Sequence, residues 1–202
     1  MRKQRSEQTK HKKNRKGKDM KAQELKDMIK GAPWEKVFDF VRVMNDKGEE
    51  YGFKAPYAYQ KAQYLRRLRY FCAQVAHESC GLLYTKELAS GKAYEGRKDL
   101  GNTEKGDGVR YKGRGYIQLT GRANYAALAK DLKIDCVNHP ELLERPEYAL
   151  LSALWFWKKR GLNKYADRDA FTELTKRING GTNGLADRLE WLRKANKYIN
   201  TL

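Results

Sequence analysis

The sequence predicts an α+β protein that is mainly α. Two observations predict this class. Apolar residues recur at helical spacing along most of the chain, and glycines crowd the stretch 91–121, which contains the strand-like piece "YIQL". The 202 residues show no internal repeat, and a chain of this length is typical of one domain with a core of its own. We therefore predict a mainly helical domain with one small β-hairpin insert.

Three helices are predicted before the glycine-rich stretch. The segment 19–33 holds apolar residues at roughly helical spacing and then a glycine and a proline, which predicts a short helix with a stop. Residues 34–48 carry an apolar stripe and close on a glycine. A long helix is predicted over 57–79, because its apolar residues share one face and its arginines lie mostly off that face.

Helical patterns return after the glycine-rich stretch. The second of them opens with Pro146 and is followed by Gly161, the residues that helices prefer at their start and just past their end. The predicted helices run over about 121–133, 146–160, 168–178 and 184–199. Trp155 and Trp157 are assigned to the core of the domain.

The basic N-terminal segment is predicted to be separate from the domain. Residues 1–33 hold 12 Lys/Arg against 4 Asp/Glu. We predict a flexible extension over 1–33 and a folded domain over 34–202. Three roles stay open for the extension: it solubilises the protein; it binds an anionic wall polymer, lipopolysaccharide or a membrane surface; or it binds nucleic acid or docks onto a larger particle.

The charge of the chain indicates a polyanionic partner. There are 43 basic and 25 acidic residues, and +10 of the net charge of +18 lies on residues 34–202. Such a charge favours nucleic acid, an anionic membrane or an anionic wall polymer without choosing among them. The N-terminus lacks the apolar stretch of a secretory signal. We expect a monomer that is synthesised in the host cytoplasm without a signal peptide and acts elsewhere after release.

Cysteine and histidine predict neither a disulfide framework nor a metal centre. Cys72, Cys80 and Cys136 are odd in number and lack metal-ligand spacing, so free thiols are expected. The three histidines are scattered along the chain. We predict no metal and no cofactor.

Two glutamates, Glu78 and Glu87, raise a geometric question. On one continuous helix, nine residues would place them on opposite faces and about 13 Å apart along the axis. Gly81 follows Glu78 by three residues, and a glycine there readily ends a helix in the left-handed conformation. If the helix stops at this point, the chain turns back and Glu87 faces Glu78.

Two facing carboxyl groups are what glycoside hydrolysis requires. One donates a proton to the leaving oxygen, and the other stays ionised as base or nucleophile. Glu78, beside the apolar face of its helix, suits the acid role, whereas Glu87 has lysines nearby and suits the ionised role. On spacing alone, surface charge and helix capping explain such a pair better than catalysis does.

A resemblance decides between these interpretations. The segments "AQVAHESCGLLYTKEL", "YEGRKDLGNTEKGDGVRYKGRGYIQLTGRANY", "ALWFWKKRGLNKYAD" and "RINGGTNGLADR" resemble the family-19 glycoside hydrolases, and most of all their phage-type endolysins. They span about residues 73–188 in the family's order. The resemblance implies a lysozyme-like fold, in which a cleft separates a helical lobe from a small β-hairpin lobe.

The resemblance also implies roles for single residues. Glu78 falls on the family's general acid, Glu87 on its general base, and Thr120 on the hydroxyl that helps to hold the attacking water. Because the family inverts the anomeric carbon, a water must fit between the two carboxyl groups, which implies a separation of about 6.5–9.5 Å.

The same resemblance implies a set of substrate-binding residues. Gln118 and Asn124 match sugar-binding positions, and His77 belongs to the motif of the acid. Asn179 and Arg188 match an element that closes the cleft and supports the base. Five of the candidate residues have a structural alternative: a bond to the helix end for His77, a solvated strand position for Gln118, a helix N-cap for Thr120, a turn for Asn179, and an exposed ion pair for Arg188.

One motif departs from the family pattern. Relatives read "HESGG" or "HETTGG", whereas this chain reads "HESCGL". Cys80 and Leu82 therefore replace small or polar residues beside the acid, and the predicted helix stop depends on Gly81 alone.

The function predicted from the sequence is that of a bacteriolytic, endolysin-type peptidoglycan hydrolase of phage origin. It would cleave β-1,4 bonds between amino sugars of peptidoglycan glycan strands, as a muramidase or a glucosaminidase. A chitinase acting on chitin oligomers is the alternative enzyme. A non-catalytic protein on a lysozyme-like scaffold, binding a polyanion or forming part of a phage particle, is the alternative of another class.

Overall fold

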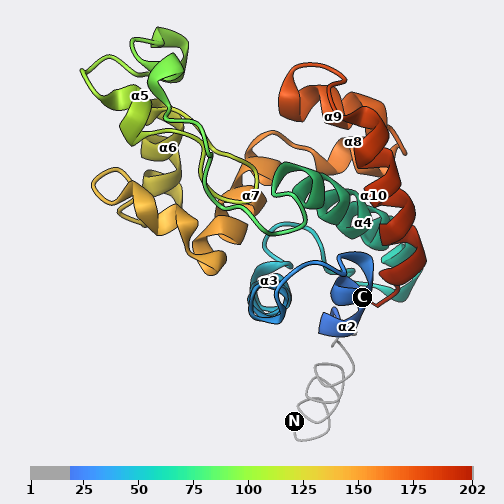
Figure 1. Cartoon of the computed structure of the whole chain (residues 1–202). Helices are drawn as coiled ribbons and strands as arrows, with labels where there is room; N and C mark the ends of the chain where they lie inside the picture. Colours follow the sequence, from blue (N-terminus) through green and yellow to red (C-terminus); the bar gives the residue numbers. More distant parts are fainter. Residues whose placement is uncertain (1–18, 202) are drawn as a thin grey trace, which may run out of the picture.

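The computed structural model describes residues 19–201, which are mainly helical (Figure 1). This confirms the predicted class. Four short 3-10 helices accompany the α-helices: η1 (Ala58–Gln60), η2 (Lys92–Tyr94), η3 (Lys98–Leu100) and η4 (Pro140–Glu144). The α-helices are α2 (Ala22–Met28), α3 (Trp34–Lys47), α4 (Lys61–Glu78), α5 (Asp107–Arg110), α6 (Arg122–Leu132), α7 (Pro146–Lys159), α8 (Asn163–Asp167), α9 (Phe171–Asn179) and α10 (Leu185–Tyr198).

The predicted hairpin is much smaller than expected. Within residues 19–201, β-pairing is limited to two isolated antiparallel bridges, Lys86 with Arg114 and Arg114 with Leu119. The expected strand 116–119 is wrong, because Gln118 has a φ of +53° and the chain turns between the two bridged residues. Arg114 and Leu119 exchange both backbone hydrogen bonds, at 3.1 and 2.8 Å, and so close a four-residue loop.

Helix α4 is the central element of the helical part. Helix α10 packs along α4, α8 contacts the same helix, and α2 packs against both α10 and α3. Figure 1 shows α4, α8, α9 and α10 together on one side of the molecule, and α5 and α6 on the other. Glu78 therefore belongs to the first group of helices, at the last residue of α4.

An aromatic cluster forms the centre of the core. The ring centroids of Phe53 and Phe71 lie 5.0 Å apart, and those of Phe71 and Trp157 lie 5.3 Å apart at nearly perpendicular planes. Edge-to-face pairs of this kind are favourable beyond the area that they bury. Trp157 also donates its indole N–H to Asn163 Oδ1 at 2.7 Å. The assignment of Trp155 and Trp157 to the core is confirmed.

The folded helical body includes residues before 34, although the sequence predicted a flexible extension up to residue 33. Met20, Leu25 and Met28 are buried, and α2 packs against α3 and α10. The side chain of Asn45 also bonds the backbone of Met20 in both directions, at 2.9 and 3.0 Å. The apolar residues of 19–33 therefore bind this segment to the domain. The remainder of the predicted extension, residues 1–18, lies outside the described residues.

No helix in the described part of the chain is both long and apolar enough to cross a membrane. The three cysteines are free thiols, buried at Cys72 and Cys136 and exposed at Cys80. Burial raises the pKa of the Cys136 thiol to about 11.

Candidate active site

Helix α4 ends directly at the candidate acid. The backbone N–H of Gly81 bonds the carbonyl of Ala76 at 2.7 Å, and that of Cys80 bonds the carbonyl of His77 at 3.2 Å. These two bonds define a Schellman motif, in which the residue just past the helix cap takes the left-handed conformation. That residue is Cys80, with a φ of +48°, rather than Gly81.

The expectation that Gly81 alone stops the helix is therefore wrong. Cys80, Gly81 and Leu82 all have positive φ, at +48°, +71° and +65°. Leu82 is fully buried, and the Ser79 hydroxyl both donates to a carbonyl of α4 and accepts from the Leu82 N–H at 2.9 Å. Burial of Leu82 and the bonds of Ser79 help to hold this left-handed turn. Cys80 and Leu82, the two residues that depart from the family motif, are therefore part of the bend.

Glu78 is anchored by a buried polar chain. Its Oε1 lies 2.6 Å from an Nη atom of Arg188, whose side chain is 3% exposed. The other Nη atom of Arg188 donates to Gln74 Oε1, and Gln74 Nε2 donates to the Thr175 hydroxyl at 2.9 Å. Gln74 and Thr175 are fully buried. These hydrogen-bonded side chains join α4, α9 and α10. Arg188 is therefore a buried partner of the candidate acid and not part of an exposed ion pair.

His77 contacts α10 instead of the end of its own helix. Its Nδ1 lies 2.6 Å from Asp187 Oδ2, and the same oxygen accepts the Trp191 indole N–H at 3.1 Å. The imidazole also packs against Gly184, where a Cβ atom would lie 2.4 Å from the ring. The alternative of a bond to the helix end is therefore wrong, and His77 fixes α10 beside Glu78.

Asn179 shapes the turn between α9 and α10. Its Oδ1 accepts the N–H of Gly181 at 2.9 Å, and its Nδ2 donates to the carbonyl of Asn183 at 2.8 Å. Arg188 Nε reaches the same carbonyl at 3.4 Å. The turn thus supports Arg188. The resemblance implied that this element supports the base, but in the structure its arginine ion-pairs with the candidate acid, Glu78.

Glu87 is held by a second, separate set of donors. Its Oε1 accepts the Tyr94 hydroxyl and its Oε2 accepts the backbone N–H of Gly113, both at 3.0 Å. The backbone N–H of Glu87 also bonds the carbonyl of Gly113 at 2.9 Å. Burial, and then the hydrogen bond to Glu87, raise the pKa of Tyr94, which therefore stays a donor at neutral pH.

Gln118 lies next to Glu87. A Cβ atom at Gly113 would lie 2.9 Å from Gln118 Oε1 and 3.1 Å from Glu87 Oε2, so both side chains border this glycine. Gln118 Nε2 donates to the carbonyl of Gly115 at 2.9 Å, which fixes the direction of the amide. Gln118 thus occupies a tight turn and not the predicted strand.

Thr120 and Asn124 continue from this turn. The Thr120 hydroxyl donates to the carbonyl of Gln118 at 2.9 Å, and Asn124 Nδ2 donates to the carbonyl of Thr120 at 2.7 Å. The N-cap of α6 is Gly121, and no side chain caps the helix. The N-cap alternative for Thr120 is therefore wrong, and its hydroxyl bonds the turn that carries Gln118.

Different residues hold the two glutamates: Arg188 pairs with Glu78, whereas Tyr94 and Gly113 donate to Glu87. A model of the family "Glyco_hydro_19: Chitinase class I" matches residues 63–177, which is more than half of the chain and includes both glutamates. The chain belongs to glycoside hydrolase family 19. Of the candidate residues, Asn179 and Arg188 lie beyond the matched segment, while those within it are His77, Glu78, Glu87, Gln118, Thr120 and Asn124.

Relatives in sequence include a protein named after the same family and several endochitinases. A family-19 domain-containing protein of Haemophilus influenzae is 36% identical over 107 residues, which cover 53% of this chain and 52% of that protein. An endochitinase of Arabidopsis thaliana is 35% identical over 126 residues, 61% of this chain and 42% of that protein. This family-19 chain thus matches about half the length of these curated relatives.

Solved family-19 structures share the fold. A mutant of chitinase C superposes with a TM-score of 0.74 at 20% identity, covering 93% of this chain and 95% of that chain. Chitinase C from Streptomyces griseus superposes with a TM-score of 0.69 at 22% identity, covering 88% and 75%. The likeness places residues 19–201 in the fold that the sequence resemblance implied.

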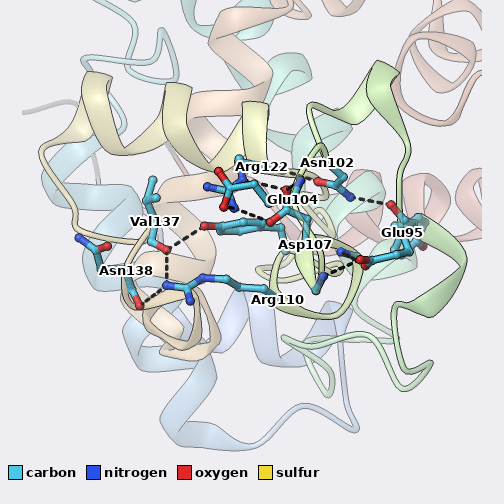
Figure 2. Close-up of polar contacts among 12 residues, drawn as sticks. Glu95, Asn102, Glu104, Asp107, Arg110, Arg122, Val137 and Asn138 are labelled. Carbon is cyan, nitrogen blue, oxygen red and sulfur yellow. Dashed lines mark hydrogen bonds and ion pairs between the residues drawn. The ribbon is translucent and has the colours of Figure 1, made fainter.

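Figure 2 shows a network of acidic, basic and amide side chains around α5 and α6 of this family-19 domain, which includes Arg122, Asp107 and Asn102. Arg122 Nε donates to Asp107 Oδ2 at 2.8 Å, and its backbone N–H donates to Asn102 Oδ1 at 2.8 Å. Asn102 Nδ2 in turn donates to the carbonyl of Tyr94 at 2.9 Å. Because Tyr94 bonds Glu87, the network ties the position of the candidate base to α5 and α6.

Sequence analysis missed the residues that hold the two glutamates. Gln74 precedes Glu78 by four positions, which places both on one face of α4, and this spacing was an available signal. Tyr94 and Gly113 approach Glu87 from 7 and 26 residues away. Turns bring them together, and no periodic pattern predicts such contacts.

Proposed function

We propose that this chain is an inverting glycoside hydrolase that cleaves β-1,4 bonds between amino sugars, with Glu78 as general acid and Glu87 as general base. The observation that carries the proposal is the separate anchoring of the two carboxyl groups. Glu78 is paired with a buried arginine on the helical side, and Glu87 is held by Tyr94 and Gly113 on the other. Family-19 membership supports the same pair of roles.

The contacts of the two carboxyl groups act at different stages of the proposed reaction. After Glu78 gives its proton to the leaving oxygen, the guanidinium of Arg188 stabilises the resulting carboxylate. Glu87 receives one hydrogen bond on each oxygen, and its further lone pairs remain to accept a proton from water. We propose that Thr120 and Gln118 orient that water, and that His77, Asn124 and Asn179 line the sugar-binding surface.

Peptidoglycan is the proposed substrate, and its hydrolysis would make the protein bacteriolytic. The positive charge of residues 34–202 supports an anionic wall as partner. Chitin is the second candidate, because the similar proteins whose names state an activity are called endochitinases and chitinases. We propose that the protein acts after release from the cytoplasm of a host cell.

Mass analysis of digestion products tests the reaction and the substrate. Digestion of purified murein should release muropeptides with new reducing ends, which identify the cleaved sugar. Glu78→Gln and Glu87→Gln should each lower kcat by a factor of about 100 or more, since general acid–base catalysis contributes that much. The exposed Glu173→Gln, a matched change on α9, should leave the rate unchanged.

Three outcomes would contradict parts of this proposal. Inert murein with active cleavage of glycol chitin would make the chain a chitinase. Full activity of both glutamate variants would remove the acid and base assignments. Polyanion binding without any product from either polymer would favour the non-catalytic alternative.

A further inference from the structure

A pocket of about 330 Å³ lies between α2 and α10, apart from both candidate glutamates. Its lining combines basic and aromatic side chains with a single acid, Asp27. The residues that line it from α10 include Trp191, Arg193, Lys194, Lys197 and Tyr198. The surface is therefore cationic and chemically unlike the carboxylate pair of the candidate active site.

Most of the positive charge in this pocket is unpaired. Arg193 forms two hydrogen bonds of 2.8 Å with Glu190, so its charge is neutralised locally. Lys30, Lys194 and Lys197 form no ion pair with any acidic side chain of residues 19–201. Three ammonium groups thus face one acid around a single hollow, an arrangement that attracts a ligand with more than one negative charge.

Two of the lysines are held in place by aromatic rings. Lys194 Nζ lies 4.3 Å from the ring centroid of Trp191, and Lys197 Nζ lies 5.0 Å from that of Tyr198. The Trp191 ring is itself fixed by its bond to Asp187. A lysine that is already ordered loses less side-chain entropy when it binds an anion, so these contacts preorganise the pocket.

We propose that this pocket binds closely spaced phosphate groups of a phosphodiester polymer attached to the bacterial cell wall. Ammonium groups bind phosphate as point charges, and several of them around one hollow suit neighbouring phosphates along a polymer. The inference that the pocket binds phosphate depends only on the residues that line it. The choice of a wall polymer as the ligand depends on the proposed function. Bound there, the polymer would keep the enzyme on its insoluble substrate.

Two kinds of variant test the pocket. The first is Lys30→Gln, Lys194→Gln and Lys197→Gln together. The second is Gly31→Glu, which adds a carboxylate to the lining without a clash, since no atom lies within 4 Å of the position of a Cβ at Gly31. The matched control changes three exposed helical lysines outside the pocket to glutamine, Lys61, Lys130 and Lys176, and so removes the same charge.

The expected result is a selective loss of binding. Calorimetry with inorganic pyrophosphate and co-sedimentation with a purified polyol-phosphate wall polymer should show affinities at least about tenfold weaker for both pocket variants than for the control. Hydrolysis of a soluble, uncharged amino-sugar oligomer should stay at the wild-type rate in all variants, so failure of the proposed reaction would be seen separately.

Two results would overturn the proposal. An equal loss in the pocket variants and in the control would show that only the total charge matters. Stronger binding of single-stranded DNA than of the wall polymer, with the same dependence on the pocket lysines, would replace the wall polymer by nucleic acid.

Discussion

Single side chains decide how each carboxyl group of this family-19 domain is held. Tyr94 donates to Glu87 from a half-buried position, and its ring can be kept while the hydroxyl is removed. Tyr94→Phe should lower kcat about tenfold or more, because a hydrogen bond to a charged group is worth about 1.5–3 kcal/mol. Steady-state kinetics measure kcat, and Tyr59→Phe, a change at an exposed residue, is the control. An unchanged kcat in Tyr94→Phe would contradict the inference that Tyr94 supports Glu87.

Gln74 offers a second test at the same scale. Gln74→Met keeps the approximate volume but removes the acceptor of Arg188 and the donor to Thr175. Since Arg188 is buried, the free energy of unfolding should fall by about 1–3 kcal/mol. Urea denaturation measures the change. Gln23→Met, a change at an exposed residue of α2, is the control. Equal stabilities of the two variants would contradict a stabilising role for the buried hydrogen bonds of Gln74.

At the scale of elements, the bend after α4 shows what sequence patterns predict and what they do not. The end of the helix near Glu78 was predicted from a glycine, and the structure confirms the end but assigns the left-handed cap to Cys80. Helices with a long apolar stripe, such as α3 and α7, were predicted to within about a residue at each end. The turns around Gly113 and Gln118 were not predicted, because contacts between distant segments determine these turns.

The bend predicts opposite effects for two neighbouring substitutions. Cys80→Gly should stabilise the fold by about 1 kcal/mol, because a left-handed conformation costs about that much for a residue with a Cβ. Gly81→Ala should destabilise it, since its φ is +71° and the new Cβ would lie 3.1 Å from Ile29. Thermal unfolding of both variants checks the signs, and a destabilised Cys80→Gly would contradict the cap assignment.

The α5–α6 network predicts a dependence of stability on pH. The hydrogen bond from Arg122 is the main reason that the pKa of Asp107 lies below its usual value. A carboxyl group whose pKa is lower in the folded state stabilises the fold above its unfolded pKa, and this contribution is lost as the pH falls through the folded pKa. The loss should therefore occur below about pH 4.

Denaturation at several pH values tests the network. Asp107→Asn should lower the free energy of unfolding by about 3 kcal/mol at pH 7, because the carboxylate is 1% exposed and paired with Arg122. The difference from wild type should shrink as the pH falls below about 4. The exposed Asp46→Asn serves as the control. A difference that stays constant over this range would contradict the contribution of the ion pair.

At the scale of the whole molecule, the boundary of the folded domain differs from the boundary that the charge of the sequence predicted. The segment 19–33 holds three basic and three acidic residues, so the positive charge of residues 1–33 lies on residues 1–18. The apolar residues of 19–33 bind this segment to α3 and α10, so counting charge over 1–33 as one block misplaced the boundary of the domain. The resemblance recovered the fold class and the family because several long motifs occurred in order, whereas the supporting contacts of each glutamate depend on tertiary structure.

Two truncations separate the role of the basic N-terminal segment from that of α2. Removal of residues 1–18 should leave the free energy of unfolding almost unchanged, whereas removal of 1–33 should lower it by several kcal/mol, because Leu25 and Met28 would leave the core. If the segment 1–18 binds an anionic wall, the shorter truncation should also flatten the dependence of lysis on salt. Turbidity assays of permeabilised cells across a salt series measure this slope. An unchanged slope would contradict electrostatic anchoring by residues 1–18 and leave the pocket between α2 and α10 as the proposed anion site.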